Sequence, residues 1–209
     1  LVLCVTDREK KITEDLCGVP AKTLPTGIRV PEKIRGFEGR RYAFFTGCMK
    51  NIQNTDAVKY FYRQIIPLIV EKIPNFKFFA VGSYPPDSLR QIESKYMEIT
   101  GYVPDTTIYA ASSILSLVPL RIGAGLKHKV VEALAYGAPV VATSVAVEGM
   151  DLAPEEEFLL ADSPKEFLEQ IQRLYSGGEL WGKISHGGHR RANLSYSMEV
   201  MERKLAGIF

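Results

Sequence analysis

A glycine-rich turn, two lysines and one glutamate fall within a short stretch of the chain: Gly123, Gly125, Lys127, Lys129 and Glu132. Backbone N–H groups at a glycine-rich turn that leads into a helix bind phosphate oxygens well. Nearby lysines add positive charge to such a site, and a carboxylate accepts hydrogen bonds from hydroxyl groups. The spacing therefore predicts an anion site with a hydroxyl-binding carboxylate beside it.

The elements around this stretch are those that such a site needs. Residues 113–118 and 139–142 are apolar and predict two strands, while residues 126–136 have helical periodicity and Gly137 can close that helix. Both lysines then fall in the first helical turn, where cations oppose the helix dipole. That position is unfavourable unless an anion is bound, which favours a ligand site.

Interpretations without a ligand stay open for the same residues. The two lysines could be ordinary exposed side chains, and Glu132 could pair on the helix surface with His128 or Lys129, worth about 0.3 kcal/mol. Arg121, just before the glycines, offers a planar fork for phosphate or carboxylate, or it pairs with an acidic neighbour.

The chain as a whole alternates strand and helix patterns, which predicts an α/β fold: a Rossmann-like parallel sheet with helices on both faces. Strands are expected at 42–46, 76–81, 98–102, 113–118, 140–142 and 158–161, and helices at 55–72, 86–96, 105–111, 126–136 and 164–175. Ligands of such sheets bind beyond the carboxyl ends of the strands. The loops that begin at Gly47, Gly82, Pro104, Pro119 and Thr143 all lie there.

The string from Gly123 to Thr143, with its Gly-x-Gly-x-Lys-x-Lys-x-x-Glu start and Gly-x-Pro-Val-Val-Ala-Thr end, resembles the group 1 glycosyltransferases. These are retaining, nucleotide-sugar-dependent enzymes of the GT-B fold. Shorter similarities run upstream from Phe45-Thr-Gly47 through Gly101-Tyr-Val-Pro-Asp105, so the resemblance covers about residues 41–160. That part corresponds to the C-terminal, donor-binding half of such an enzyme.

The resemblance implies roles for individual residues. Gly47 would let the backbone approach the phosphates, Gly82 would lie beside the nucleotide base, and Tyr102 and Val103 would lie against the uracil or guanine ring. Glu132 would bind the ribose hydroxyls. The remaining donor-binding residues are expected around the diphosphate: Lys50, Arg121, Gly123, Gly125, Leu126, Lys127 and Lys129. We assign catalysis to Lys127 and Glu132, keeping open that Gly47 only forms a turn and that Tyr102 is a core residue.

Three departures from the family pattern bear on catalysis. Ala124 stands where the first glutamate of the Glu-x7-Glu pair is expected, and Cys48 and Gln53 stand where an arginine and a lysine are expected. A non-catalytic nucleotide-binding or docking module is therefore an alternative, as is a nucleotide-sugar epimerase. A dinucleotide-dependent oxidoreductase fits poorly, because His128 occupies the place of the third glycine of Gly-x-Gly-x-x-Gly.

The expected domain organisation follows from the same resemblance. Residues 1–27 would be the end of an N-terminal acceptor domain, 28–41 a charged linker, 42–196 the nucleotide-sugar-binding domain, and 197–209 a helix that crosses back to the N-terminal domain. The acceptor would be a glycan, a lipid-linked glycan or a small molecule. Because most of the acceptor domain lies outside this chain, the chain alone is expected to be inactive.

Composition fits a globular protein of 209 residues with 46% hydrophobic and 24% charged residues. A net charge of +2 gives no argument for nucleic acid. Cys4, Cys17 and Cys48 form no metal-spaced pair, so we expect reduced thiols, a cytoplasmic protein and no metal cofactor. Peripheral contact with the inner face of the membrane, through the N-terminal domain, stays open. His186 and His189 are expected in a glycine-rich loop without a catalytic role.

Overall fold

The computed structural model describes residues 1–208, and its centre is a six-stranded, all-parallel sheet. In sheet order the strands are β5 (Met97–Gly101), β4 (Phe78–Val81), β3 (Ala43–Thr46), β6 (Leu115–Val118), β7 (Val140–Ala142) and β8 (Leu159–Leu160). Strand order reverses between β3 and β6, where the connections leave the sheet in opposite directions. This is the switch point at which open parallel sheets bind ligands.

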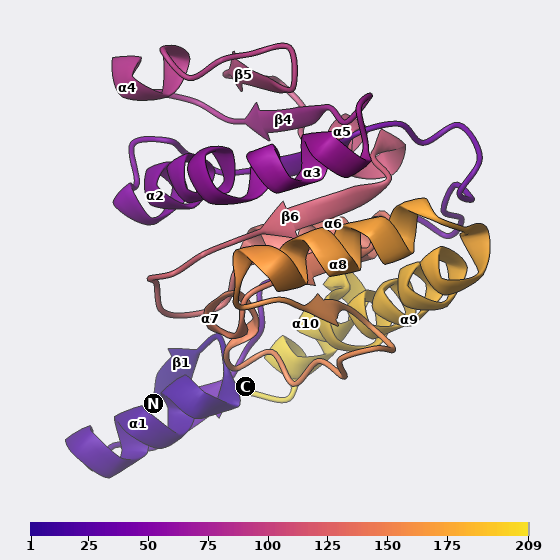
Figure 1. The fold of residues 1–209 in the computed structure, drawn as a ribbon. Helices are drawn as coiled ribbons and strands as arrows, with labels where there is room; N and C mark the ends of the chain where they lie inside the picture. The colour runs from indigo at the N-terminus through magenta and orange to yellow at the C-terminus, as the bar shows by residue number, and fades with distance from the viewer. Residues whose placement is uncertain (209) are drawn as a thin grey trace.

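Two layers of helices cover the sheet (Figure 1). One holds α2 (Ile52–Tyr60), α3 (Ile66–Lys72) and α8 (Pro164–Tyr175), and the other holds α5 (Thr107–Ser112), α6 (His128–Ala135) and α9 (Gly178–Tyr196). Apolar side chains of both layers and of all six strands form one continuous core. The predicted Rossmann-like parallel sheet with helices on both faces is therefore confirmed.

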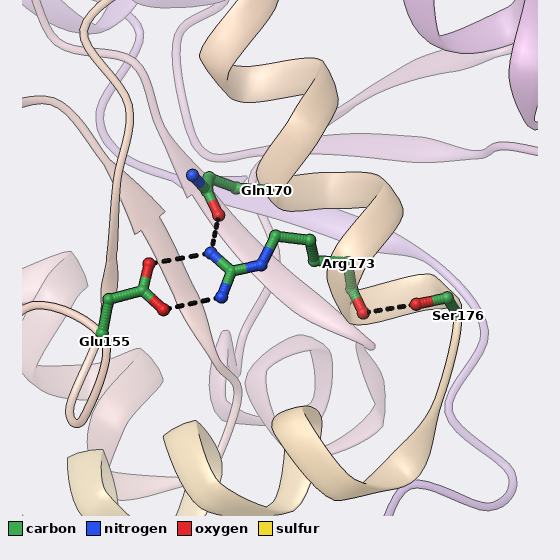
Figure 2. A network of polar contacts seen from close by, with 4 residues as sticks. All are labelled: Glu155, Gln170, Arg173 and Ser176. Atoms are coloured by element: carbon green, nitrogen blue, oxygen red, sulfur yellow. Dashed lines mark hydrogen bonds and ion pairs between the residues drawn. The ribbon is translucent and has the colours of Figure 1, made fainter.

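Helix α8 begins and ends as its sequence predicts. Ser163 and Glu166 form a reciprocal capping box at its N-terminus, and Pro164 occupies the first turn, where no N–H is needed. Near its C-terminus Arg173 forms a two-pronged ion pair with Glu155, at 2.7 Å for each N–O contact, and also donates to Gln170 (Figure 2). This network fastens the loop before β8 to the helix layer.

The segment predicted as a helix at 55–72 is helical but not α-helical throughout. A π-helical turn, η1 (Phe61–Ile65), separates α2 from α3, and the N–H of Ile66 donates to the carbonyl of Phe61. The cause is Pro67, which has no N–H to donate and whose ring would collide with a carbonyl of the preceding turn. The proline therefore changes the hydrogen-bond spacing without ending the helix.

Two further local predictions are wrong. The helix expected at 86–96 is only α4 (Asp87–Arg90), because Ser94 and Met97 form a tight turn and Glu93 accepts a hydrogen bond from the N–H of Ile99. His186 and His189 lie inside helix α9 and not in a loop. The glycines between them serve close packing: a Cβ at position 187 would lie 2.0 Å from the carbonyl oxygen of Glu156.

A small N-terminal unit lies at one end of the sheet domain (Figure 1). Strands β1 (Val2–Cys4) and β2 (Ala21–Thr23) pair in parallel, with α1 (Asp7–Cys17) between them. Helix α1 buries none of its residues. Several large apolar side chains of this unit are exposed: Leu1, Val2, Leu3, Ile12, Leu16 and Val19. The unit is therefore far less packed than the sheet domain.

The segment 28–41, predicted as a linker, is anchored on the sheet domain by one buried side chain. The Arg40 guanidinium donates hydrogen bonds to five backbone carbonyls of the chain and lies 4.8 Å from the centre of the Trp181 ring. Burial lowers the pKa of Arg40 to about 10. Arg40 therefore fixes the C-terminal end of this segment to the sheet domain.

Helix α10 (Met198–Ala206) returns the chain to the N-terminal unit. Ser197 caps the helix and pairs with Ile28, and Lys22 donates to the carbonyl of Gly207 at 3.4 Å. Figure 1 shows the two chain ends on this side of the molecule. Of the segment predicted at 197–209, Phe209 lies outside the described residues. Within residues 1–208, no helix has the length and apolar character to cross a membrane.

Candidate functional site

A cavity of about 470 Å3 opens at the switch point of the sheet. Its walls come from the loops that follow β3, β4, β5 and β6 and from the first turns of α6. Of the residues predicted to bind a donor, most line this cavity: Gly47, Gly82, Tyr102, Val103, Gly123, Leu126, Lys127, Lys129 and Glu132. Segments almost 90 residues apart in sequence are thus brought to one place.

Two glycines in van der Waals contact form the floor of the cavity. Gly82 has φ +150°, and a Cβ at this position would lie 1.9 Å from the carbonyl oxygen of Gly47. A Cβ on Gly47 would in turn lie 2.6 Å from the side-chain nitrogen of Asn54. Position 82 therefore requires glycine, because a Cβ there would overlap the backbone of Gly47, and a Cβ at position 47 would displace the Asn54 side chain.

Lys129 is a half-buried cation without a carboxylate partner among residues 1–208. Its ammonium donates to the side-chain oxygen of Asn54 and lies 4.0 Å from the centre of the Phe45 ring. Desolvation and, to a smaller extent, the neighbouring charge of Lys127 together lower the pKa of Lys129 to about 7. A bound anion would restore the stability of the charged form.

Lys127 lies at the N-cap position of α6, because the helix begins at His128 and not at 126 as predicted. Its ammonium donates to the carbonyl of Gly125 at 2.6 Å, which folds the side chain over the glycine turn. Burial lowers the pKa of Lys127, opposed by the negative charge of Glu9. Two lysines thus flank the start of α6, where helix N–H groups lack intrahelical partners.

Glu132 also lines the cavity, one turn further along α6, and is buried, with 8% of its surface exposed. It accepts a hydrogen bond from the hydroxyl of Thr106. Burial raises its pKa, opposed by that hydrogen bond and by the charge of His128. Its surroundings exclude the exposed surface pair with His128 or Lys129, and leave a desolvated carboxylate able to accept further hydrogen bonds.

Tyr102 and Val103 line the cavity directly after β5. The Tyr102 side chain is 75% exposed, which excludes the alternative that it belongs to the core. An exposed aromatic ring at the mouth of a cavity offers a stacking surface to a planar group.

Three of the predicted residues do not line this cavity. Arg121 forms a two-pronged ion pair with Asp56, at 3.0 and 2.5 Å, and its guanidinium lies 4.7 Å from the centre of the Tyr60 ring. Lys50 is exposed on the loop before α2. Gly125 borders a second, smaller cavity on the far side of the glycine turn. Arg121 therefore has the acidic partner that the sequence left as its alternative role.

The structure adds site residues that sequence reasoning did not single out. Thr106 holds Glu132, and Asn54 holds Lys129 and also donates to the carbonyl of Cys48. Thr106 could have been predicted from its position, since it follows the end of a predicted strand by only a few residues. Residues 1–208 contain no cluster of histidine, cysteine and carboxylate side chains that could hold a metal ion.

A family model described as "Glycosyl transferases group 1" matches residues 40–177. This range includes all residues that line the cavity, the glycine turn, and both Lys129 and Glu132 of α6. The chain belongs to this family. The match confirms the family that the motif from Gly123 to Thr143 suggests.

Individual relatives of this group 1 chain agree with the family match. "Glycosyltransferase 1 domain-containing protein 1" of Xenopus tropicalis is 26% identical over 137 residues, which are 62% of this chain and 40% of that protein. The chain therefore spans less than half of that relative's length.

Solved structures of similar fold cover almost the whole chain. A mutant of TarM from S. aureus, in complex with Fondaparinux, alpha-GlcNAc-glycerol and UDP, has a TM-score of 0.83 at 15% identity, over 99% of this chain and 43% of that protein. HepE of Anabaena, in complex with UDP and glucose, has a TM-score of 0.81 at 12% identity, over 100% of this chain and 62% of that protein. At these identities the similarity shows the fold.

Proposed function

We propose that this chain is the C-terminal, donor-binding half of a retaining GT-B glycosyltransferase. It would hold a nucleotide diphosphate sugar in the cavity at the switch point and support transfer of the sugar to an acceptor hydroxyl. The observation that carries this proposal is the pair Lys129 and Glu132, a half-buried, desolvated cation and a buried carboxylate on one helix that both line the cavity. A ligand with a diphosphate at one end and hydroxyls at the other satisfies both.

The lysines and the glycine turn would stabilise the diphosphate as it leaves the sugar. Lys127, Lys129 and the free N–H groups at the start of α6 place positive potential where negative charge accumulates during the reaction, and this electrostatic help is a large part of catalysis. Glu132 would bind the ribose, and Tyr102 with Val103 the base. UDP in two solved relatives of the same fold supports a nucleotide ligand.

The acceptor would be a glycan, a lipid-linked glycan or a small molecule, bound largely by residues outside this chain. This agrees with the 40–62% of the relatives' lengths that the chain spans. The proposed location is the cytoplasm, with peripheral contact at the membrane made by the N-terminal domain. No metal is assigned to the reaction, since the two lysines supply the charge that a cation would.

Calorimetric titration of this chain with UDP, GDP, UDP-glucose and GDP-mannose tests the proposal. We expect saturable binding of one nucleotide series, weakened about tenfold or more by Lys127→Ala, because a charge-assisted hydrogen bond contributes about 1.5–3 kcal/mol. Lys50→Ala is the matched control, because it removes an exposed lysine outside the cavity. Absence of binding to all four ligands at millimolar concentration would refute a donor site.

A binding module without turnover is the second candidate. It is favoured by Ala124, Cys48 and Gln53, which line the cavity at positions where the family pattern has a glutamate, an arginine and a lysine. A product assay on the full-length protein separates the two candidates. Turnover that Lys127→Ala abolishes supports the enzyme, whereas nucleotide binding without turnover at any acceptor concentration supports the module.

A further inference from the structure

A second cavity, of about 140 Å3, lies between helix α1 of the N-terminal unit and the glycine turn. Ala124 lines both this cavity and the main one, so the two adjoin at that residue. The donor cavity is therefore bordered at its glycine-turn end by a helix that precedes the sheet domain in sequence.

The glycine-turn end of the main cavity has no carboxylate of its own. Ala124 offers only a methyl group there, and among the described residues Glu132 is the one acidic side chain that lines the main cavity. Glu132 lies beyond the glycine turn, on the second turn of α6, where it is held by Thr106. A sugar bound near Ala124 would thus have hydroxyls facing a wall without a strong acceptor.

Glu9 of α1 borders this wall. Its Oε2 accepts a hydrogen bond from the N–H of Val5 at 3.1 Å, and its own N–H donates to the hydroxyl of Thr6 at 3.1 Å. The hydrogen bond from Val5 orients the carboxylate, and the one to Thr6 fixes the backbone of Glu9 in the first turn of α1. The other oxygen, Oε1, lies 3.1 Å from the place where a Cβ of Gly125 would be. Only a glycine at 125, with φ +72°, leaves this space open.

Two acidic residues line the second cavity, and they differ in their partners. Glu148 forms an ion pair with Arg8 of α1. Within residues 1–208, Oε1 of Glu9 accepts no hydrogen bond and Glu9 forms no ion pair. Glu9 is therefore the acidic side chain of this cavity with an acceptor oxygen to spare. A carboxylate oxygen binds sugar hydroxyls strongly because its hydrogen bonds are charge-assisted.

We propose that Glu9 contacts the sugar of the donor, and that it supplies from the N-terminal unit the carboxylate that position 124 lacks. This inference rests on the proposed function. It makes α1 part of the donor site, with Oε1 of Glu9 accepting a hydrogen bond from a hydroxyl of the sugar ring. The contrasting role is purely structural: Glu9 caps α1 and neutralises Lys127 without touching a ligand.

Titrations with a free nucleoside diphosphate and with its sugar conjugate distinguish these roles. With UDP and UDP-glucose, or GDP and GDP-mannose, as the probe pair, Glu9→Gln should weaken binding of the conjugate about tenfold and leave the free diphosphate within about twofold. Glu9→Asp keeps the charge near Lys127 but withdraws the oxygen by one methylene, so it should show the same selective loss. If Glu9 only neutralises Lys127, Glu9→Asp should bind both the conjugate and the free diphosphate with affinities close to those of the wild type.

Glu14→Gln is the matched control. Glu14 lies on the same helix and its carboxylate accepts a hydrogen bond from the N–H of Ala21 at 3.2 Å, but it does not line either cavity. Thermal unfolding of all three variants reports on the cap of α1. Equal affinity of wild type and Glu9→Gln for the conjugate, or an equal loss for both ligands of the pair, overturns the proposal. A wild-type chain that binds neither ligand refutes the proposed function itself, and this proposal with it.

Discussion

Two parts of the main cavity carry opposite charges. We call them the lysine end, around Lys127 and Lys129, and the glutamate end, around Glu132. Lys129 lies in the first turn of α6 and Glu132 in the second, yet each is held by a neutral partner, Asn54 and Thr106 respectively. Burial shifts both pKa values toward the neutral form, downward for the lysine and upward for the glutamate. Within residues 1–208 neither side chain forms an ion pair, so a ligand that pairs with them gains binding free energy.

The ends differ in how densely they are charged. The lysine end has two cations, and the charge of Lys127 helps to lower the pKa of Lys129. The glutamate end has one carboxylate beside a hydroxyl and an exposed aromatic ring. This asymmetry fits a ligand whose negative charge is concentrated at one end. The desolvated lysine and glutamate also lower the stability of the folded chain, as expected of functional sites.

Gly82→Ala should have the largest effect, because it acts on both ends at once. The new Cβ would lie 1.9 Å from the Gly47 oxygen and would separate the strand ends that form the cavity floor. We expect a loss of stability of about 2–4 kcal/mol in chemical denaturation and no measurable nucleotide binding. Gly101→Ala is the control: φ is also positive, at +72°, but nothing lies near its Cβ, so about 1 kcal/mol is expected. Equal effects of the two substitutions would contradict the close contact.

Lys129→Met tests the lysine end alone. Removing a cation that faces the diphosphate should weaken binding roughly a hundredfold, since hydrogen bonds to charged groups contribute about 1.5–3 kcal/mol each. Stability should stay equal or rise by about 1 kcal/mol, because an apolar side chain next to Phe45 replaces a desolvated ammonium that has no ion-pair partner within residues 1–208. Calorimetry and denaturation on the same samples check both signs. A destabilised variant would show that Lys129 serves the fold and not a ligand.

Glu132→Gln tests the other end and should have a smaller effect, roughly tenfold. The amide keeps the shape of the side chain and an oxygen for the Thr106 hydroxyl, but loses the charge that strengthens bonds to ribose hydroxyls. A 2′-deoxynucleotide provides the matched ligand. If Glu132 binds the 2′-hydroxyl, the substitution should weaken the ribonucleotide and leave the deoxynucleotide almost unchanged, whereas equal weakening of both would place Glu132 elsewhere.

Much of this architecture could be predicted from the sequence, since it depends on local pattern. The apolar strands at 115–118 and 140–142, and α8 with its Ser163 cap, lie where periodicity and capping residues place them. The misplaced elements depend on packing between distant segments. Glycines 187 and 188 suggested a loop, but they allow α9 to lie against the backbone of residues 156–157 and the side chain of Leu134.

The site divides in the same way. The sequence indicates Lys127, Lys129 and Glu132 because they lie close together at the start of one helix, and Gly82 because it follows an apolar strand. The partners Asn54 and Thr106 come from other segments, so only the folded chain shows that they hold Lys129 and Glu132. For Arg121 the sequence allowed either an anion ligand or an acidic partner, and the structure pairs it with Asp56, 65 positions away. Pairing across such separations is not encoded in spacing.

The smallest expected effect is the pH dependence of the lysine end. Since the pKa of Lys129 is lowered from 10.5 to about 7, the unfolded chain binds more protons in this window, and stability should rise with pH from 7 to 10.5 and be independent of this group below 7. Ligand binding has the opposite sign, because it needs the cation. Affinity should fall about threefold between pH 6.5 and 7.5 if the charged form alone binds.

A nucleotide sugar is the proper ligand for this measurement, because its doubly esterified diphosphate lacks the monoester group that titrates near pH 6. The other ionisable groups that line the cavity are those of Cys48, Tyr102, Lys127, His128 and Glu132. Histidine is the side chain that most often changes charge in this range, so His128→Gln is the necessary control. If the slope persists in His128→Gln and disappears in Lys129→Met, the titrating group is Lys129, and the lysine end is set apart from the glutamate end by its proton uptake. The reverse pattern would assign the slope to His128 and leave the two ends alike in this respect.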